Sequence, residues 1–203
     1  MTRKTAYCFD LDATVTEAEI LPAIAGALGQ QAAMAALTQA AMAGKIGFES
    51  SMRQRCQMLG QIDLARVHGI IDAIPLNRDI LAFIRAHADD CTIITGNLDV
   101  WIAPLMGKIG CNWRSSAARY SGGHLVIDQI INKGRAAEDI FAIGAYDRLI
   151  AIGDGANDIP MFRAADIAIA FGGVHPPAPA VLQAAQHRAD SGAALVALLG
   201  QLS

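Results

Sequence analysis

The chain has 203 residues, a formal net charge of -3 and a hydrophobic fraction of 53%. This length suits one domain with a large buried core and a subdomain. The charge gives no electrostatic reason to expect nucleic-acid binding, and polar residues interrupt every apolar run before it reaches membrane-spanning length. No signal-like apolar stretch precedes the first pair of acidic residues, so we expect a cytoplasmic protein that binds neither nucleic acid nor membrane.

The first predicted element is a buried strand over residues 5–11, because aromatic and apolar side chains there suit a packed sheet. It ends in Phe9-Asp10-Leu11-Asp12-Ala13-Thr14. Strand alternation would point Asp10 and Asp12 to the same side, where two carboxylates repel each other and lose hydration. A metal ion or a reaction would offset that cost. The alternative is a strand that simply ends in turn-forming acids.

The next segment, residues 16–74, contains no strand-like run and predicts helices. Examples are residues 19–28, 30–43 and 48–59. We expect this segment to be a small helical cap inserted into the fold, and residues 1–15 and 75–203 to form the core domain.

After an amphipathic helix over residues 76–87, a strand near 91–95 leads into Thr95-Gly96-Asn97. A hydroxyl followed by a glycine offers donors to phosphate oxygens, with the amino terminus of a helix over 99–109 behind them. Taken alone, Thr95 is an ordinary helix N-cap.

Residues 113–131 predict a hairpin that turns at residues 121–123. Lys133 follows, just before an amphipathic helix over 134–143. Its ammonium group would neutralise phosphate charge and keep a nearby carboxylate ionised. Taken alone, Lys133 is an ordinary surface lysine.

A strand over 149–152 is followed by Gly153-Asp154-Gly155-Ala156-Asn157-Asp158 and a helix to residue 165. Asp154 at the strand end and Asp158 in the first helical turn would face one small volume. Two carboxylates with water and a substrate phosphate form the oxygen-rich shell that Mg²⁺ prefers. The alternative is an ordinary strand–helix junction, but the paired acids earlier in the chain favour a Mg²⁺ site.

A strand over 167–171 and a final helical stretch after residues 176–179 complete the pattern. Alternating strands and helices predict an α/β fold, a Rossmann-like parallel sheet core with the cap inserted. The acids, hydroxyl and lysine would then meet at the carboxyl ends of the strands, where such sheets bind ligands. The histidines show no ligand-like clustering.

The order of acid pair, hydroxyl, lysine and acid pair resembles the haloacid dehalogenase superfamily of phosphohydrolases, and specifically its phosphoserine phosphatase-like branch. The resemblance implies that Asp10 is the nucleophile and Asp12 the general acid and base, with Lys133 as the third catalytic residue. It implies Mg²⁺ bound by Asp10, the backbone carbonyl of Asp12 and Asp154, with Asp158 in support. The implied phosphate- and substrate-binding residues are Glu19, Met42, Phe48, Arg55, Thr95, Gly96, Asn97 and Asn157.

Three positions depart from the branch. Ala13 stands where Ser or Gly is usual, Thr95 replaces Ser, and Asn97 replaces a Gly that flanks the substrate phosphate. The Asn97 side chain would either narrow the pocket or add a hydrogen bond.

We therefore expect a Mg²⁺-dependent phosphomonoesterase with an aspartyl-phosphate intermediate, acting on phosphoserine as a monomer or homodimer. One alternative is a phosphatase or phosphotransferase of the same superfamily with another small phosphomonoester substrate. A phosphoryl-accepting signalling domain is disfavoured by Asp12 and the cap. A non-catalytic metabolite-binding relative is disfavoured because no motif acid is lost.

Overall fold

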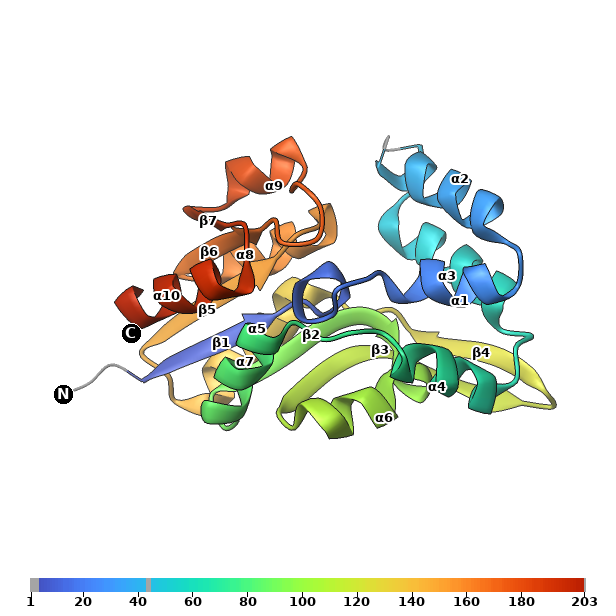
Figure 1. Cartoon of the computed structure of the whole chain (residues 1–203), viewed down its shortest axis with the longest axis horizontal. Coiled ribbons are helices and arrows are strands. Elements are labelled where there is room, and N and C mark those ends of the chain that lie inside the picture. Colours follow the sequence, from blue (N-terminus) through green and yellow to red (C-terminus); the bar gives the residue numbers. More distant parts are fainter. Residues whose placement is uncertain (1–3, 43–44, 203) are drawn as a thin grey trace.

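The chain folds around a seven-stranded sheet with the order β4-β3-β2-β1-β5-β6-β7 (Figure 1). This computed structural model describes residues 4–42 and 45–202. Among the described strands, β3 and β4 pair antiparallel and the other neighbours pair parallel. The expected α/β class with a mostly parallel sheet is confirmed. The strands are β1 Thr5–Phe9, β2 Cys91–Leu98, β3 Asn112–Ser121, β4 His124–Gln129, β5 Arg148–Gly153, β6 Ile167–Phe171 and β7 His187–Ala189.

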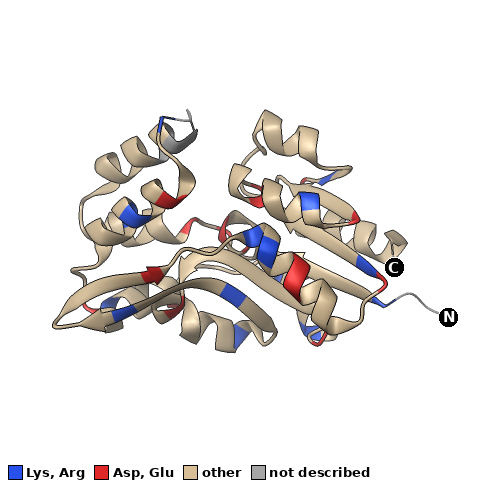
Figure 2. Ribbon diagram, turned by 180° about the vertical axis from the view of Figure 1, so that it is seen from behind, with Lys and Arg blue, Asp and Glu red and all other residues tan. Residues whose placement is uncertain are grey.

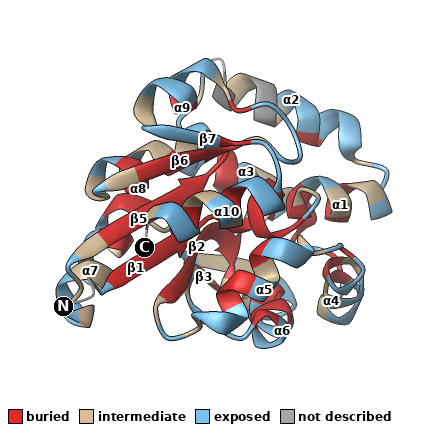
Figure 3. Cartoon of the chain, turned by 60° about the vertical axis from the view of Figure 1, so that its left-hand side comes forward, coloured by how far each residue is buried: buried red, intermediate tan, exposed pale blue. Residues whose placement is uncertain are grey.

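Helices cover both faces of the sheet, and alternate residues of β1 belong to the two apolar clusters that lie on these faces. Tyr7 and Phe9 belong to the larger apolar cluster, whereas Ala6 and Cys8 belong to a second cluster of small side chains. Buried strands therefore lie between two helical layers (Figure 3). The layer on the larger cluster holds α5 Arg78–Ala86, α6 Asp99–Ile109 and α10 Gly192–Leu202, and the other holds α7 Lys133–Gly144, α8 Ile159–Ala164 and α9 Pro179–Ala184.

Between β1 and β2 the chain forms a group of helices at one end of the molecule (Figure 1). The two segments that join this group to the core lie side by side: Thr16 pairs with Leu76, and the Asn77 N–H donates to the Val15 carbonyl at 2.9 Å. This pairing supports the proposed cap boundaries at 15/16 and 74/75. The helices are α1 Ile20–Ala27, α2 Gln31–Met42, α3 Phe48–Leu59 and α4 Leu64–Asp72.

The helical group is held against the core on two sides. His68 on α4 has its Nε2 2.8 Å from the Val100 carbonyl on α6. On α3, Arg53 donates to the Ile127 carbonyl of β4 at 3.3 Å. These contacts attach α4 and α3 to the core.

The first strand is shorter than the sequence pattern predicts, because it ends at Phe9 and not at residue 11. Residues Leu11–Val15 form a helical turn with Ala13 at φ 51°. Thr16 closes this turn: its Oγ1 donates to the Leu11 carbonyl at 3.0 Å and accepts from the Ala13 N–H at 3.2 Å. Strand alternation therefore does not position Asp12, and that part of the expectation is wrong.

Two other elements differ from expectation. Strand β2 continues through Leu98, so Thr95-Gly96-Asn97 lies within it. A short strand, β7, interrupts the expected last helical stretch and pairs with β6 through Phe171 and Ala189. Three residues are too few to show a period-2 pattern. The hairpin turn is as predicted, with Gly122 and Gly123 at positive φ, which suits a two-residue turn.

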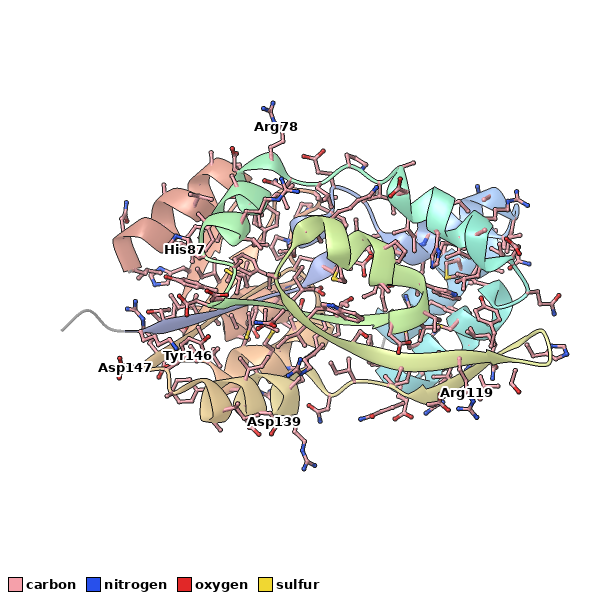
Figure 4. All side chains as sticks on the ribbon, turned by 90° about the horizontal axis from the view of Figure 1, so that it is seen from below. Arg78, His87, Arg119, Asp139, Tyr146 and Asp147 are labelled. Atoms are coloured by element: carbon pink, nitrogen blue, oxygen red, sulfur yellow. The ribbon has the colours of Figure 1, made fainter. Side chains whose placement is uncertain are left out.

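The opposite end of the sheet, at the amino end of β1, is closed by residues preceding β5. The Lys4 N–H donates to Asp147 at 2.9 Å, and the Lys4 ammonium lies 4.5 Å from the centre of the Tyr146 ring. Figure 4 shows Tyr146 and Asp147 at this end. Charged residues are interspersed along the ribbon in Figure 2, and neither sign covers a face in that view. Within the described residues, no helix has both the length and the apolar character needed to span a bilayer.

Candidate active site

Four polar residues from separate elements meet beyond the carboxyl ends of the central strands. Asp10 follows β1, Asp154 follows β5, Asp158 ends the short helical turn Ala156–Asp158, and Lys133 begins α7. All four are buried, with between 0% and 7% of each residue exposed. Charged residues are seldom buried unless they are paired or bind an ion, so this cluster is the strongest candidate for a functional site.

Lys133 bridges two carboxylates. Its Nζ donates to Asp10 Oδ1 and to Asp158 Oδ1, each at 2.6 Å. Burial and the charge of Asp158 raise the pKa of Asp10 well above its ordinary value, and Lys133 opposes this shift. The two carboxylates raise the pKa of Lys133 more than burial lowers it. Lys133 is therefore a cation that holds Asp10 in place and supports its ionised form.

The oxygens of Asp10, Asp154 and Asp158 lie within 4.8 Å of one another. Burial, and next the charge of Asp158, raises the pKa of Asp154 to about 7. A divalent cation would relieve this repulsion, and hard carboxylate oxygens are the donors that Mg²⁺ prefers. The donor set therefore fits Mg²⁺.

Asp158 also shapes the loop that carries Asp154. Its Oδ2 accepts from the backbone N–H groups of Asp154 at 3.2 Å and Gly155 at 3.0 Å. A Cβ on Gly153 would lie 2.4 Å from this same oxygen, so the close approach requires glycine. The Asn157 side chain lies against the same loop. Its Oδ1 would be 2.3 Å from a Cβ added to Gly155.

Asp12 lies on the cap side of the site, apart from the Lys133 bridge. Its Oδ1 accepts from the Ile20 N–H at the start of α1 at 2.7 Å, and its Oδ2 accepts from Asn97 Nδ2. Burial, and next the charge of Glu19, raises the pKa of Asp12 to about 7. A carboxyl with that pKa can both donate and accept a proton near neutral pH.

The predicted phosphate-binding segment lies within β2 and is buried. Thr95 Oγ1 accepts from the Asn97 N–H at 3.2 Å and from Asn97 Nδ2 at 2.9 Å. The Phe48 ring of α3 lies over Gly96, where an added Cβ would be 3.1 Å from the ring. The cap is thus in contact with the predicted phosphate-binding segment.

Two further cap residues, Arg55 and Met42, were predicted to bind the substrate. Arg55 is partly buried, its pKa is lowered by burial, and the charges of Glu19 and Asp12 act on it in the opposite direction. Its Nε is buried without a partner among the described residues. Arg53 instead pairs with Glu49 at 2.9 Å. The Met42 side chain lies outside the described part of the structure.

Sequence reasoning missed His175, on the loop after β6. Its Nε2 lies 3.2 Å from Glu19 Oε1 and 3.4 Å from Asp154 Oδ2. The interpretation that the histidines do not cluster with ligand-type residues is therefore wrong for His175. No local signal marks this contact, since 156 positions separate Glu19 and His175.

Comparisons with known proteins identify the family of this chain. A family profile described as haloacid dehalogenase-like hydrolase matches residues 8–163. A phosphoserine phosphatase of Mycobacterium tuberculosis is 28% identical over 180 residues, which cover 83% of this chain but 44% of that protein. The phosphoserine phosphatase of Methanocaldococcus jannaschii is 25% identical over 181 residues, covering 83% of this chain and 86% of that protein.

A solved structure described as the phospho-aspartyl intermediate analogue of phosphoserine phosphatase has a TM-score of 0.80 and 26% identity, and the match covers 99% of each chain. The profile spans well over half of the sequence and includes Asp10, Asp12, Lys133, Asp154 and Asp158. The chain belongs to the haloacid dehalogenase-like hydrolase family.

Proposed function

We propose that this hydrolase is a Mg²⁺-dependent phosphoserine phosphatase that works through an aspartyl-phosphate. The observation that carries the substrate assignment is that Arg55, Glu19 and Asp12 lie near enough for the charge of Glu19 to act on both of the others. A guanidinium beside a carboxylate suits a substrate with both a carboxylate and an ammonium group. The similarity to proteins named phosphoserine phosphatase supports the same assignment.

In the proposed first step, a carboxylate oxygen of Asp10 attacks phosphorus. The new Asp10 O–P bond forms as the bond from phosphorus to the serine oxygen breaks. Asp12, in its protonated form, gives its proton to that leaving oxygen, so that serine departs as a neutral alcohol.

In the second step, water attacks the phosphorus of the aspartyl-phosphate and Asp12 takes its proton. The Asp10 O–P bond breaks, which releases inorganic phosphate and returns Asp10 as a carboxylate. A pKa of about 7 suits Asp12 to both roles.

The other residues position charge. Asp10, the backbone carbonyl of Asp12 and Asp154 would hold Mg²⁺, with Asp158 in support, and Mg²⁺ would draw charge from the phosphoryl oxygens when bound. Lys133 and the Thr95 hydroxyl would contact the remaining oxygens. Phe48, in contact with Gly96, would exclude water when the cap closes over the substrate.

A second candidate is a phosphatase or phosphotransferase for another small phosphomonoester. Asn97 favours it, because its side chain occupies space next to the proposed phosphate position. A phosphoryl-accepting signalling domain would not release phosphate continuously, so steady-state phosphate release separates it from both enzymes.

The test is a hydrolysis screen with Mg²⁺ over small phosphomonoesters that includes phosphoserine and phosphoethanolamine, which lacks the carboxylate. We expect kcat/KM for phosphoserine to exceed that for phosphoethanolamine by at least roughly tenfold, since an arginine–carboxylate pair is worth about 1.5–3 kcal/mol. Equal values would reject phosphoserine and leave the general phosphatase assignment.

A further inference from the structure

Asn97 is a buried amide that links two residues of the proposed reaction. It is 1% exposed and lies in β2 two residues after Thr95. Its Nδ2 donates to Asp12 Oδ2 and to Thr95 Oγ1, the latter at 2.9 Å. Its Oδ1 is buried and has no partner among the described residues. The Asn97 amide is therefore held by the two hydrogen bonds that its Nδ2 donates, while its buried Oδ1 accepts none among the described residues.

These contacts restrain the Asp12 carboxyl from both sides. Oδ1 accepts from the Ile20 N–H at 2.7 Å, and Oδ2 accepts from Asn97. The first donor belongs to the cap and the second to the central sheet, so Asp12 spans the junction between them. Each carboxylate oxygen has a second lone pair, which stays free for a proton that moves to or from a substrate.

The same amide orients the Thr95 hydroxyl. Thr95 Oγ1 accepts from both the backbone N–H and the Nδ2 of Asn97. A hydroxyl has two lone pairs and one proton. With both lone pairs engaged, the proton must point elsewhere, and Thr95 can act only as a donor toward a phosphate oxygen.

We propose that Asn97 is a positioning residue for the proton-transfer steps of this hydrolase. It orients the Asp12 carboxyl toward the leaving oxygen in the first step and toward the attacking water in the second. The proposal rests on the proposed phosphatase function and deepens it. It does not depend on which small alcohol leaves.

Leaving-group dependence distinguishes this role from a structural one. An alkyl leaving group needs the proton of Asp12, whereas a p-nitrophenolate leaves without one. The ratio kcat/KM reports steps up to the first phosphoryl transfer. A misoriented Asp12 carboxyl should therefore lower kcat/KM strongly for an alkyl phosphate. The decrease in kcat/KM for an aryl phosphate should be much smaller. Hydrolysis of the intermediate still needs Asp12 as a base, so phosphoenzyme should accumulate with the aryl substrate.

The experiment compares Asn97→Ala and Asn97→Gly with the unaltered protein on phosphoserine, phosphoethanolamine and p-nitrophenyl phosphate, with Mg²⁺. The matched control is Ser116→Ala. Ser116 is also buried; its hydroxyl donates to the Gly96 carbonyl at 2.8 Å and accepts from the Ile131 N–H at 3.1 Å, and neither contact involves Asp12. Melting temperatures are measured for every variant, and either Asn97 variant that retains a cooperative transition suffices.

We expect each Asn97 variant to lower kcat/KM for the best alkyl phosphate by roughly tenfold more than for p-nitrophenyl phosphate, the size of one lost charge-assisted hydrogen bond. A burst of p-nitrophenolate should precede its slower steady state. Ser116→Ala should change kcat/KM for the alkyl and the aryl phosphate by the same factor. Equal losses on alkyl and aryl phosphates in the Asn97 variants, or no loss, would overturn the role of Asn97 alone. Absence of any phosphatase activity in the unaltered protein would overturn the proposed function together with this inference.

Discussion

The Lys133 ammonium lies 2.6 Å from Asp10 Oδ1, and both side chains are almost completely excluded from solvent. A second carboxylate, Asp158, lies at the same distance from the ammonium. With both carboxyls ionised, these three groups carry two negative charges and one positive charge. A further cation would compensate the remaining negative charge in this buried site.

Removal of the Lys133 ammonium group should lower both the stability of the fold and the activity. Lys133→Met would leave Asp10 and Asp158 buried without their cation, and breaking such a pair costs about 3–5 kcal/mol. We expect a lower melting temperature and loss of turnover. Lys133→Arg, which keeps the charge, is the control. Calorimetry checks this, and an unchanged melting temperature in Lys133→Met would contradict it.

Asp154 and Asp158 should differ in their effect on the metal requirement. Asp154→Ala would remove a proposed oxygen ligand, so we expect the Mg²⁺ concentration for half-maximal activity to rise by orders of magnitude. Asp158→Ala should raise it less but lower stability more, because Asp158 holds two loop N–H groups as well as Lys133. Titration of activity with Mg²⁺ after chelator treatment measures the first effect. Full activity in chelator would refute the metal site.

Stability should depend on pH and Mg²⁺ together. The pKa values of Asp12 and Asp154 are raised from 3.8 to about 7 on folding. The folded state therefore keeps protons that the unfolded chain releases, and these groups contribute less stability as pH rises from about 4 to about 7. Mg²⁺ at the proposed site would replace the proton at Asp154, so it should raise the melting temperature more at about pH 8 than at about pH 5.

Asp154→Asn is the control for this pH effect, since an amide does not titrate in that range. Thermal unfolding with Mg²⁺ or chelator at the two pH values gives the comparison. A Mg²⁺ shift that is larger in acid would contradict the assignment of Asp154 as a metal ligand.

Arg55 should determine preference for the substrate carboxylate. Arg55→Ala is expected to erase the advantage of phosphoserine over phosphoethanolamine, about ten- to a hundredfold in kcat/KM, while p-nitrophenyl phosphate is spared. Arg53→Ala is the matched control, because Arg53 lies on the same helix but contacts Glu49 and the Ile127 carbonyl. A preference that survives in Arg55→Ala, or that is lost equally in Arg53→Ala, would exclude this role.

Much of the site follows from chain order and strand ends. Parallel strands bring their carboxyl ends to one edge, so the sequence predicts that Asp10 and Asp154 lie near each other, as the structure shows. From the sequence, Lys133 was expected to neutralise phosphate charge and to keep a nearby carboxylate ionised, but the bridge that it forms between Asp10 and Asp158 was not predicted. Its two partners lie 123 and 25 positions away along the chain, and nothing local indicates both.

The surroundings of Asp12 could not be predicted in the same way. Alternation along a strand placed Asp12 beside Asp10, but the chain leaves the strand at Phe9 and turns through Ala13 at positive φ. That turn carries the Asp12 carboxyl toward Ile20 and Asn97. The contact to His175 was missed for a related reason, because loop residues approach the site through tertiary packing without a periodic pattern.

The covalent role of Asp10 is the central claim, and acid-quenched intact mass spectrometry tests it most directly. During turnover of p-nitrophenyl phosphate by Asp12→Asn with Mg²⁺, we predict a species heavier by one phosphoryl group, which peptide mapping assigns to Asp10. The same adduct should be absent from an Asp10→Asn variant that folds normally and has no turnover. Substantial Mg²⁺-dependent turnover by Asp10→Asn, or a phosphoryl group mapped to another residue, would contradict the account.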